Sequence, residues 1–503
     1  MNSKSNFFRC LVLAAGVFLL PHFLSCKAKS TLPAEKPESS LPVSKVDFRK
    51  PFEVSNNFED KKRCNEINNL ISESKYRSAN WGFAAVSLST GKLLCAKNEN
   101  ELFVPASIEK LLTSIVSLEK LGEEFRWETR VYSDFAAEAG VVKGNIYLYG
   151  GGAPDLTTAD IVAFAKAIKN KGIRRIEGDV IGDESFFKGD SLGDGWSWNE
   201  IQWYYGAAAS ALSIDMNRAE VTVKPGAPGS NSKYVSVSGE IQPVDDIEAF
   251  GLKRELGTNN VFVWGNSDHS KVQVSIAKPA LLAALILKEN LEKEGVEISG
   301  EARARNWLSA DKLNPNRAFL WETKVSKPLG EVVQTMNKDS VNLYAELMLR
   351  MLGKNFGSEA PDDDPKIERL RGDDLAGAAV IKKWLLVNGI AGDEIAIHDG
   401  SGLSRLDLLT PETFVRALLF VSESKNSHTL YNSLPIAGKD GTLKSRLIGH
   451  NIVAKTGSFM YVNSLAGFKV GTETVAFAII GNNITTGKDS NQLLDRIVVK
   501  FGN

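Results

Sequence analysis

Ile452-Val453-Ala454-Lys455-Thr456-Gly457 lies near the C-terminus, and its apolar residues predict a strand. The last three residues, Lys455-Thr456-Gly457, occur only once in the chain and complete an ordered set of three short motifs. The other two are Ser107-Ile108-Glu109-Lys110, which follows a proline, and Ser340-Val341-Asn342, which precedes a helical pattern. Together they predict a serine acyl-transfer enzyme in which lysine, rather than histidine, moves the protons.

The order and context of the motifs carry this prediction, because the first two patterns are common in this chain. Ser-x-x-Lys also begins at Ser72, Ser89, Ser117 and Ser309, and Ser-x-Asn also recurs. What distinguishes Ser107 is the helical pattern that follows it, with apolar residues spaced to form one buried stripe and a glycine at the end: Ile108, Leu111, Leu112, Ile115, Val116 and Gly122.

The helical spacing places Ser107 and Lys110 three residues apart, so both lie on one face and can meet. A serine hydroxyl needs a base, and a lysine serves as one only when burial or a second cation destabilises its ammonium. Lys455 is the candidate second cation. The alternative is that Ser107 is an ordinary helix cap and Lys110 a solvated surface lysine.

The other motif residues have roles that fit the same reaction. Ser340 is a candidate proton relay to the leaving amine, and Asn342 a candidate for holding the substrate amide. Gly457 lets a substrate backbone approach closely, since it has no side chain. The candidates that remain are the oxyanion-binding amides of Ser107 and Ser458, and a carboxylate-binding pair, Lys455 and Thr456.

Length and composition predict a globular protein of two or more domains. The chain has 503 residues and a net charge of −1, which argues against a nucleic-acid partner. HExxH and paired CxxC motifs are absent from the sequence, and Gly150-Gly151-Gly152 lacks the lysine of a P-loop. We therefore expect neither a metal nor a cofactor. The sequence does not predict an oligomeric state.

The N-terminus predicts export to the periplasm or cell envelope. Residues 1–26 combine basic Lys4 and Arg9 with a short apolar core, the pattern of a signal peptide. Ser25-Cys26 resembles a bacterial lipoprotein processing site, which would attach the chain to a membrane by a lipid on Cys26; a chance cysteine after an ordinary signal is the alternative. Residues 27–58 are rich in Pro, Ser, Lys and Glu and predict a flexible tether.

Two further cysteines, Cys64 and Cys95, could pair in an oxidising compartment, or remain unpaired as small core residues. Between them, Ile67 to Tyr76 predicts a helix. The chain as a whole predicts an α/β domain formed by residues 59–125 and 320–503, split by an insertion at 126–319. The insertion is rich in short strands and glycine turns and is long enough for one or two small domains.

The ordered motifs and the insertion resemble the penicillin-binding D-alanyl-D-alanine carboxypeptidases of the low-molecular-mass class C type. Further segments resemble that family: Gly150 to Thr157, Gly178 to Val180, Ser185 to Phe187, Ser210 to Ser213, Asp399 to Arg405 and Ala437 to Leu443. The resemblance implies a transpeptidase domain of the penicillin-binding/β-lactamase-like fold, an α/β (α+β) class.

By resemblance, Ser107 is the acylated nucleophile, Lys110 its base, Ser340 and Asn342 the second motif, and Lys455, Thr456 and Gly457 the substrate-facing strand. The family implies removal of the terminal D-alanine from peptidoglycan stem peptides, often also cleavage of D-amino-acid cross-links, and inhibition by β-lactams.

One departure concerns substrate preference. Where the family has an aspartate after the glycines this chain has Ala153, and Asp155 follows two places later. The family aspartate meets the diamino acid of the stem peptide together with an arginine at the place of Arg405. We expect Asp155 and Arg405 to bind substrate, with the shifted Asp155 in place of the family aspartate, while the preference for a diaminopimelate side chain stays open.

Three alternatives remain at this point. Gly189-Asp190-Ser191-Leu192-Gly193 fits the GxSxG pattern of an α/β-hydrolase-type esterase, with His398, His428 and His450 as candidate bases, although no clear strand leads into it. The second alternative is a catalytically silent penicillin-binding fold that serves as an envelope scaffold. The third is a β-lactamase, which shares the acylation machinery and differs in fast deacylation.

Overall fold

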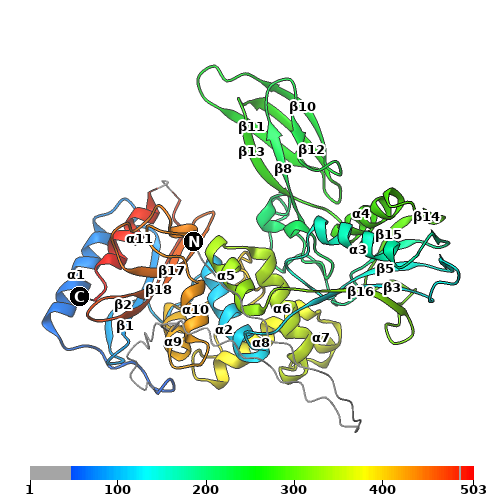
Figure 1. The fold of residues 1–503 in the computed structure, drawn as a ribbon. Helices are drawn as coiled ribbons and strands as arrows, with labels where there is room; N and C mark the ends of the chain where they lie inside the picture. Colours follow the sequence, from blue (N-terminus) through cyan, green and yellow to red (C-terminus); the bar gives the residue numbers. More distant parts are fainter. Residues whose placement is uncertain (1–46, 486–488, 503) are drawn as a thin grey trace, which may run out of the picture. The chain divides into compact units, whose positions relative to one another are not determined.

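A computed structural model describes residues 47–485 and 489–502. The predicted signal peptide, Cys26 and the tether up to residue 46 lie outside the described residues. Both ends of the described chain meet in one antiparallel sheet of order β17-β18-β19-β1-β2 (Figure 1). Its strands are β17 (Ile452–Phe459), β18 (Val462–Lys469), β19 (Val475–Asn482), β1 (Asn80–Ser87) and β2 (Leu93–Lys97).

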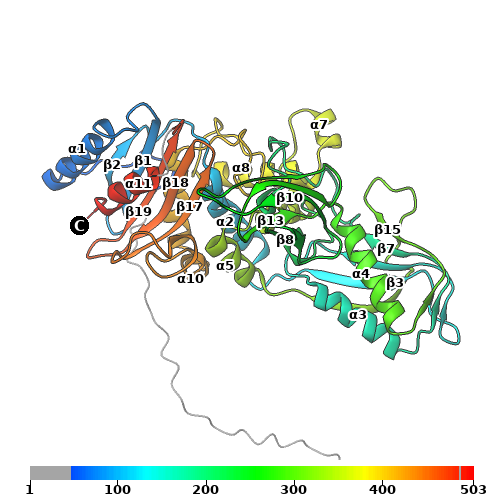
Figure 2. The same cartoon turned by 90° about the horizontal axis from the view of Figure 1, so that it is seen from above.

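This sheet is covered on both faces, so β1 is apolar along nearly its whole length. Phe83 and Ala85 pack on one face, with α1 (Phe58–Ser72) and α11 (Ser490–Val499). Ala84 and Val86 face the other side, with α2 (Lys110–Leu121) and α9 (Pro411–Ser422). Figure 2 shows α1 and α2 on opposite sides of the sheet. The sheet with helices on both faces confirms the predicted α/β class.

A helical layer surrounds α2, which is buried along most of its length. Its neighbours are α5 (Leu329–Asp339), α6 (Asn342–Phe356), α8 (Asp373–Val387) and α9. The helices α7 (Pro365–Leu370) and α10 (Ser427–Ser433) lie in the same half of the chain. Because every residue of α6 from Asn342 to Gly353 is buried, this helix is a rigid base for the side chains at its N-terminus.

The inserted residues form several sheets of short strands. A sheet of order β15-β7-β5-β3-β16 packs against α3 (Thr158–Asn170) and α4 (Pro279–Lys293). Thr157 and Asp160 close a capping box that starts α3, and Pro279 occupies the first turn of α4. The strands are β3 (Glu128–Ser133), β5 (Ile146–Gly150), β7 (Val180–Asp183), β15 (Ala302–Arg305) and β16 (Phe319–Val325), beside the two-residue strands β4 (Val141–Val142), β6 (Arg175–Ile176) and β14 (Glu297–Ile298).

The remaining strands form two small sheets, of order β13-β8-β9 and β10-β12-β11. Alternate residues of β8 and β12 are buried, which places Val221, Val223, Val261 and Val263 in a shared apolar core. The strands are β8 (Arg218–Val223), β9 (Gly229–Ser230), β10 (Ser236–Gln242), β11 (Ala249–Arg254), β12 (Asn260–Asn266) and β13 (Ser270–Ser275).

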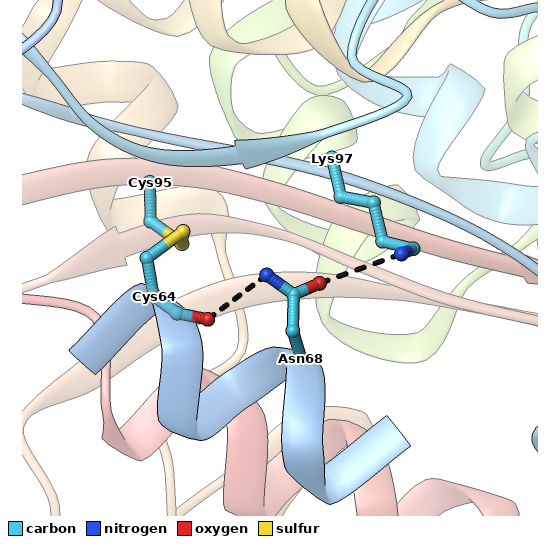
Figure 3. Close-up of a disulfide and its surroundings, with 4 residues drawn as sticks. All are labelled: Cys64, Asn68, Cys95 and Lys97. Atoms are coloured by element: carbon cyan, nitrogen blue, oxygen red, sulfur yellow. Dashed lines mark hydrogen bonds between the residues drawn. A yellow bond between two sulfur atoms is a disulfide. The ribbon is translucent and has the colours of Figure 1, made fainter. Parts of the chain in front are cut away.

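The two cysteines of the N-terminal region are joined in a disulfide that ties α1 to β2 (Figure 3). Asn68, on the next turn of α1, donates to the carbonyl of Cys64 and accepts from Lys97 of β2. The helix begins at Phe58, nine residues before the predicted start, because Asn57 caps it.

Residues 47–57, which the sequence places in the tether, contact the domain. The guanidinium of Arg416 donates to the carbonyls of Phe48 and Lys50 and lies over the ring of Phe52. Val54 forms an isolated bridge with Leu93 at the edge of the main sheet. A few aromatic side chains and one buried arginine therefore suffice to hold a segment whose composition predicts a flexible chain.

Candidate active site

Ser107 lies in a 3-10 turn (Ala106–Glu109) that leads directly into α2. Ala106 before it has φ of +51°, a left-handed conformation that an alanine adopts only under tertiary constraint. Lys110 is the first residue of α2, and its side chain is 0% exposed. Lys110 is therefore not the solvated surface lysine of the alternative reading.

Lys110 is held by three acceptors. Its Nζ lies 2.8 Å from Ser107 Oγ and donates to Asn342 Oδ1 at 2.6 Å and to the carbonyl of Ser401 at 2.7 Å. Burial lowers the pKa of Lys110 to about 7, although the carboxylates of Asp399 and Glu346 act in the opposite direction. Near neutral pH a large fraction of Lys110 is thus the free amine, which can accept the proton of Ser107.

The second motif lies at the junction of two helices. Ser340 ends α5 in a left-handed conformation, and Asn342 begins α6. The amide nitrogen of Asn342 donates to the carbonyl of Tyr205, from the inserted region, at 2.8 Å. This bond fixes which way the amide faces, because Asn342 Oδ1 must then point toward Lys110.

The third motif brings a second buried amine to the site. Lys455 Nζ donates to Ser340 Oγ and to the carbonyl of Thr456, each at 2.8 Å. Its side chain is 0% exposed, and burial together with the charge of Lys110 lowers the pKa of Lys455 well below its usual value. The three motifs therefore form two linked pairs, Ser107 with Lys110 and Ser340 with Lys455.

The strand that carries the third motif, β17, is the edge of the main sheet. The amide of Ala454 donates to the carbonyl of Pro435, on the side away from β18. Because amides alternate along a strand, those of Thr456 and Ser458 also face this edge. Ser458 is exposed there, and the hydroxyl of Thr456 bonds to that of Thr442 at 2.7 Å.

Gly457 lies against the turn that carries the nucleophile. A Cβ at this position would be 2.2 Å from Ser464 Oγ and 2.9 Å from the amide nitrogen of Ser107. Ser464 in turn donates to the carbonyl of Pro105 at 2.6 Å. The glycine therefore keeps β17 close to Ser107, and its conformational freedom is secondary to this close approach.

The two residues predicted to bind the substrate side chain, Arg405 and Asp155, have different partners in the structure. Arg405 is exposed, stacks its guanidinium 4.6 Å from the ring of Phe459 and donates to the carbonyl of Met460. Asp155 accepts the amide of Lys327 at 2.9 Å and lines a cavity of about 1000 Å³ together with Arg218. Within the described ranges no hydrogen bond or ion pair joins Asp155 to Arg405.

The sequence did not predict several residues that shape the site. Ser401 supplies an acceptor for Lys110, and Asp399 accepts the amides of Ser401, Gly402 and Ser404 that shape this loop. The segment Asp399 to Arg405 resembles the family in sequence, but that resemblance gave no role to Asp399 or Ser401. Its signal was a carboxylate followed by small residues, which is typical of a turn built around a buried side chain.

The esterase reading is wrong in structural terms. Residues 189–193 lie in an irregular segment between β7 and the turn at Tyr204, and no strand leads directly into Ser191 and no helix directly follows it. His398 pairs with Asp194, and His428 contacts Asn432 on its own helix. None of these bonds would activate Ser191.

A half-buried serine hydrogen-bonded to a buried lysine at the start of a helix, a Ser-x-Asn turn and an edge strand carrying Lys-Thr-Gly define an active-site serine enzyme of the penicillin-binding fold. The model of the D-Ala-D-Ala carboxypeptidase 3 (S13) family matches residues 64–501, and the chain belongs to this family. It is thus a serine carboxypeptidase, as the motifs predicted, and the predicted family is confirmed.

Individual relatives agree over most of their length. The chain is 28% identical over 455 residues to the D-alanyl-D-alanine carboxypeptidase DacB of Haemophilus influenzae, covering 84% of this chain and 89% of the relative. It is also 28% identical over 471 residues to a D-alanyl-D-alanine carboxypeptidase of an Actinomadura species, covering 87% and 84%.

Among solved structures, the crystal structure of penicillin binding protein 4 (dacB) from Haemophilus influenzae matches with a TM-score of 0.74 at 26% identity. The match covers 86% of this chain and 98% of the other. A second structure of that protein, complexed with a novel β-lactam, matches with a TM-score of 0.70. The penicillin-binding fold predicted from the motifs is therefore confirmed.

Proposed function

We propose that this enzyme removes the terminal D-alanine from peptidoglycan stem peptides through an acyl-enzyme on Ser107, and that β-lactams inhibit it by acylating the same serine. The observation that carries the proposal is the 2.8 Å contact between Ser107 Oγ and Lys110 Nζ, with the pKa of Lys110 lowered to about 7. A nucleophile and a base in this geometry need no cofactor.

Acylation begins when the Lys110 amine takes the proton of Ser107 while Oγ attacks the carbonyl carbon of the penultimate residue. The carbonyl oxygen gains negative charge, and the amides of Ser107 and Ser458 are the donors placed to stabilise it. Asn342 supports this step from two sides, since its oxygen holds Lys110 and its second amide hydrogen is free for the substrate.

Collapse of the tetrahedral intermediate breaks the peptide bond, and the leaving nitrogen needs a proton. Ser340 gives its hydroxyl proton to that nitrogen and regains one from Lys455, whose Nζ lies 2.8 Å from Ser340 Oγ. The terminal carboxylate of the substrate binds beside Thr456 and Lys455. The proton that Lys110 took from Ser107 then passes to Lys455 and replaces the one given to the leaving nitrogen, so Lys110 is again the free amine. Lys110 next takes a proton from the attacking water and returns it to Ser107 Oγ as the ester bond breaks, which restores the serine and releases the shortened peptide.

The remaining expectations concern bond choice and location. Arg405 and Asp155 are proposed to bind the stem peptide; Arg405 lies over Phe459, and Asp155 accepts the amide of Lys327. Cleavage of D-amino-acid cross-links is a second activity of the same site. Export to the cell envelope, with a lipid on Cys26 as its finer form, stays a proposal; the described residues contain no helix with the length and apolar character to cross a membrane.

Labelling by fluorescent penicillin tests the nucleophile. Wild-type protein should be labelled, Ser107→Ala should lose labelling and D-alanine release, and Lys110→Ala should acylate orders of magnitude more slowly because its base is gone. Ser117→Ala and Lys120→Ala are matched controls, since they form another Ser-x-x-Lys pair on the same helix. Labelling that persists in Ser107→Ala would show that another residue is acylated.

Digestion of purified peptidoglycan, with products separated by mass, tests bond choice. Loss of one D-alanine from pentapeptide stems is expected from carboxypeptidase action. Conversion of cross-linked dimers to monomers would add the endopeptidase activity. A protein that binds penicillin on Ser107 and releases neither product would instead be the scaffold that the sequence left open.

A further inference from the structure

Three buried carboxylates converge beneath the catalytic serine. One oxygen from each of Glu109, Asp399 and Asp407 lies within 4.8 Å of the others, and all three side chains are buried. Glu109 sits between Ser107 and Lys110 in the nucleophile's own turn. The catalytic steps above use none of these carboxyl groups.

The charged groups around Glu109 come from three elements of the fold. Lys110 neighbours it in the chain, Glu346 on α6 carries its partner Arg350 at 3.1 Å, and Asp399 and Asp407 lie in the segment after α8. Three ionised carboxylates at this separation and burial repel one another strongly, since little solvent screens them. At least one proton must therefore be held within the cluster.

Hydrogen bonds identify which group is ionised. Asp399 is surrounded by donors: the amides of Ser401, Gly402 and Ser404, the hydroxyl of Ser401, and the indole nitrogen of Trp196. A carboxyl group that accepts several backbone amides is stable as the anion. Asp399 is therefore the carboxylate of the three.

The other two carboxyls have oxygens without donors. Asp407 accepts the amide of His398 on Oδ1, and its Oδ2 has no partner. Both oxygens of Glu109 also lack a donor, although Glu109 is only 1% exposed. A proton on Glu109 that is donated to Asp407 Oδ2 would give that oxygen a partner and turn one Glu109 oxygen into a donor.

We propose that Glu109 is a positioning residue that stays protonated in the folded enzyme, donates its proton to Asp407, and so removes one negative charge from beside Lys110. Burial and the charge of Asp399 raise the pKa of Glu109 well above its usual value, although a side-chain hydrogen bond with Asp407 acts in the opposite direction. Burial and the charges of Glu109 and Asp399 raise the pKa of Asp407 as well, so the choice of Glu109 as the donor rests on the amide that Asp407 accepts from His398. The consequence for catalysis rests on the proposed role of Lys110 as the base.

The neutral state of Glu109 has a direct effect on its neighbour. An ionised Glu109 would favour the ammonium form of Lys110, because an opposite charge nearby stabilises a cation. The protonated acid removes this influence while its bond to Asp407 keeps the 398–407 segment in place. That segment carries Ser401, whose carbonyl accepts from Lys110.

Two isosteric changes test the protonation state. In Glu109→Gln and Glu109→Met the side chain is neutral at every pH, so the pH at which acylation by fluorescent penicillin falls to half its plateau should stay within a few tenths of a unit of wild type. If Glu109 were ionised, both changes would remove an anion beside Lys110 and shift that midpoint down by about one unit or more. Such a shift would overturn the proposal. Glu119→Gln, on helix α2 that follows this turn, is the matched control.

Infrared spectroscopy tests the proton itself, independently of activity. At neutral pH the difference spectrum between wild type and Glu109→Gln should contain the carbonyl band of a protonated carboxylic acid. The frequency of this band should shift when the protein is transferred to heavy water. Absence of that band, as expected for an ionised cluster balanced by a bound cation, would refute the proposal. Because this readout needs no acylation at Ser107, it separates a failure here from a failure of the proposed function.

Discussion

The lowered pKa of Lys110 predicts that acylation loses rate in acid, below neutral pH. Lys110 acts as a base only when deprotonated, and burial moves its pKa from 10.5 to about 7. The rate should therefore be at its plateau above that pKa and fall as the pH drops through it. At about pH 5 only roughly 1% of Lys110 is the free amine, so acylation should be about 100-fold slower than on the plateau.

The magnitude shows why burial matters. A lysine with the ordinary pKa of 10.5 would be free amine in only about 0.03% of molecules at neutral pH, roughly a thousandfold less than this Lys110. No other change of the site is needed to account for a base that works at neutral pH. The complete burial of the side chain supplies the cause.

The assay is the second-order rate constant for acylation of Ser107, measured by stopped-flow with a fluorescent penicillin whose carboxylate stays ionised across the range. Circular dichroism at each pH excludes unfolding as the reason for a loss. A rate that stays flat into acid, or one that keeps rising toward the ordinary lysine range, would refute the role of burial. Lys110→Ala should show a low rate without the same titration.

Two further predictions concern packing. Gly457→Ala should slow acylation roughly 100-fold, because its Cβ would clash with Ser464 and move β17 away from Ser107. Gly229→Ala, where a Cβ would meet open space, is the control. Acylation of Gly457→Ala at the wild-type rate would contradict this argument. Replacing Cys64 and Cys95 together by alanine should lower the free energy of unfolding, measured by denaturant titration, by about 3 to 4 kcal/mol, because the disulfide closes a loop with a sequence separation of 31. The rate of acylation should be unchanged. A variant as stable as wild type would show that the disulfide adds nothing to stability.

Local patterns predicted the elements that carry their own periodicity. The stripe after Pro105 became α2, with Ser107 and Lys110 in contact, and the apolar run ending in Lys455 became an edge strand. The helix predicted at Ile67 began earlier, at Phe58, because its first turns are polar and are held by a cap and a disulfide rather than by an apolar stripe.

Other features depended on distant contacts and left no local signal. The prediction that Asp155 and Arg405 bind substrate rested on their place in two motifs, and no local pattern indicated their contacts in the fold, Asp155 with Lys327 and Arg405 with Phe459. Tyr205 orients Asn342 through a backbone carbonyl, an interaction open to any residue type. No side-chain pattern could have marked it.

The sequence by itself determined the kind of enzyme, since the chemical groups of the three motifs, their order and the insertion between the first two are properties of the chain alone. Only the tertiary structure decided the protonation of those groups. Lys110 takes its acceptors from Asn342 and Ser401, which are 232 and 291 residues away. A pKa is set by burial and by nearby charges, so Lys110 and Lys455 have their lowered pKa values, and Glu109 its raised one, only in the folded protein.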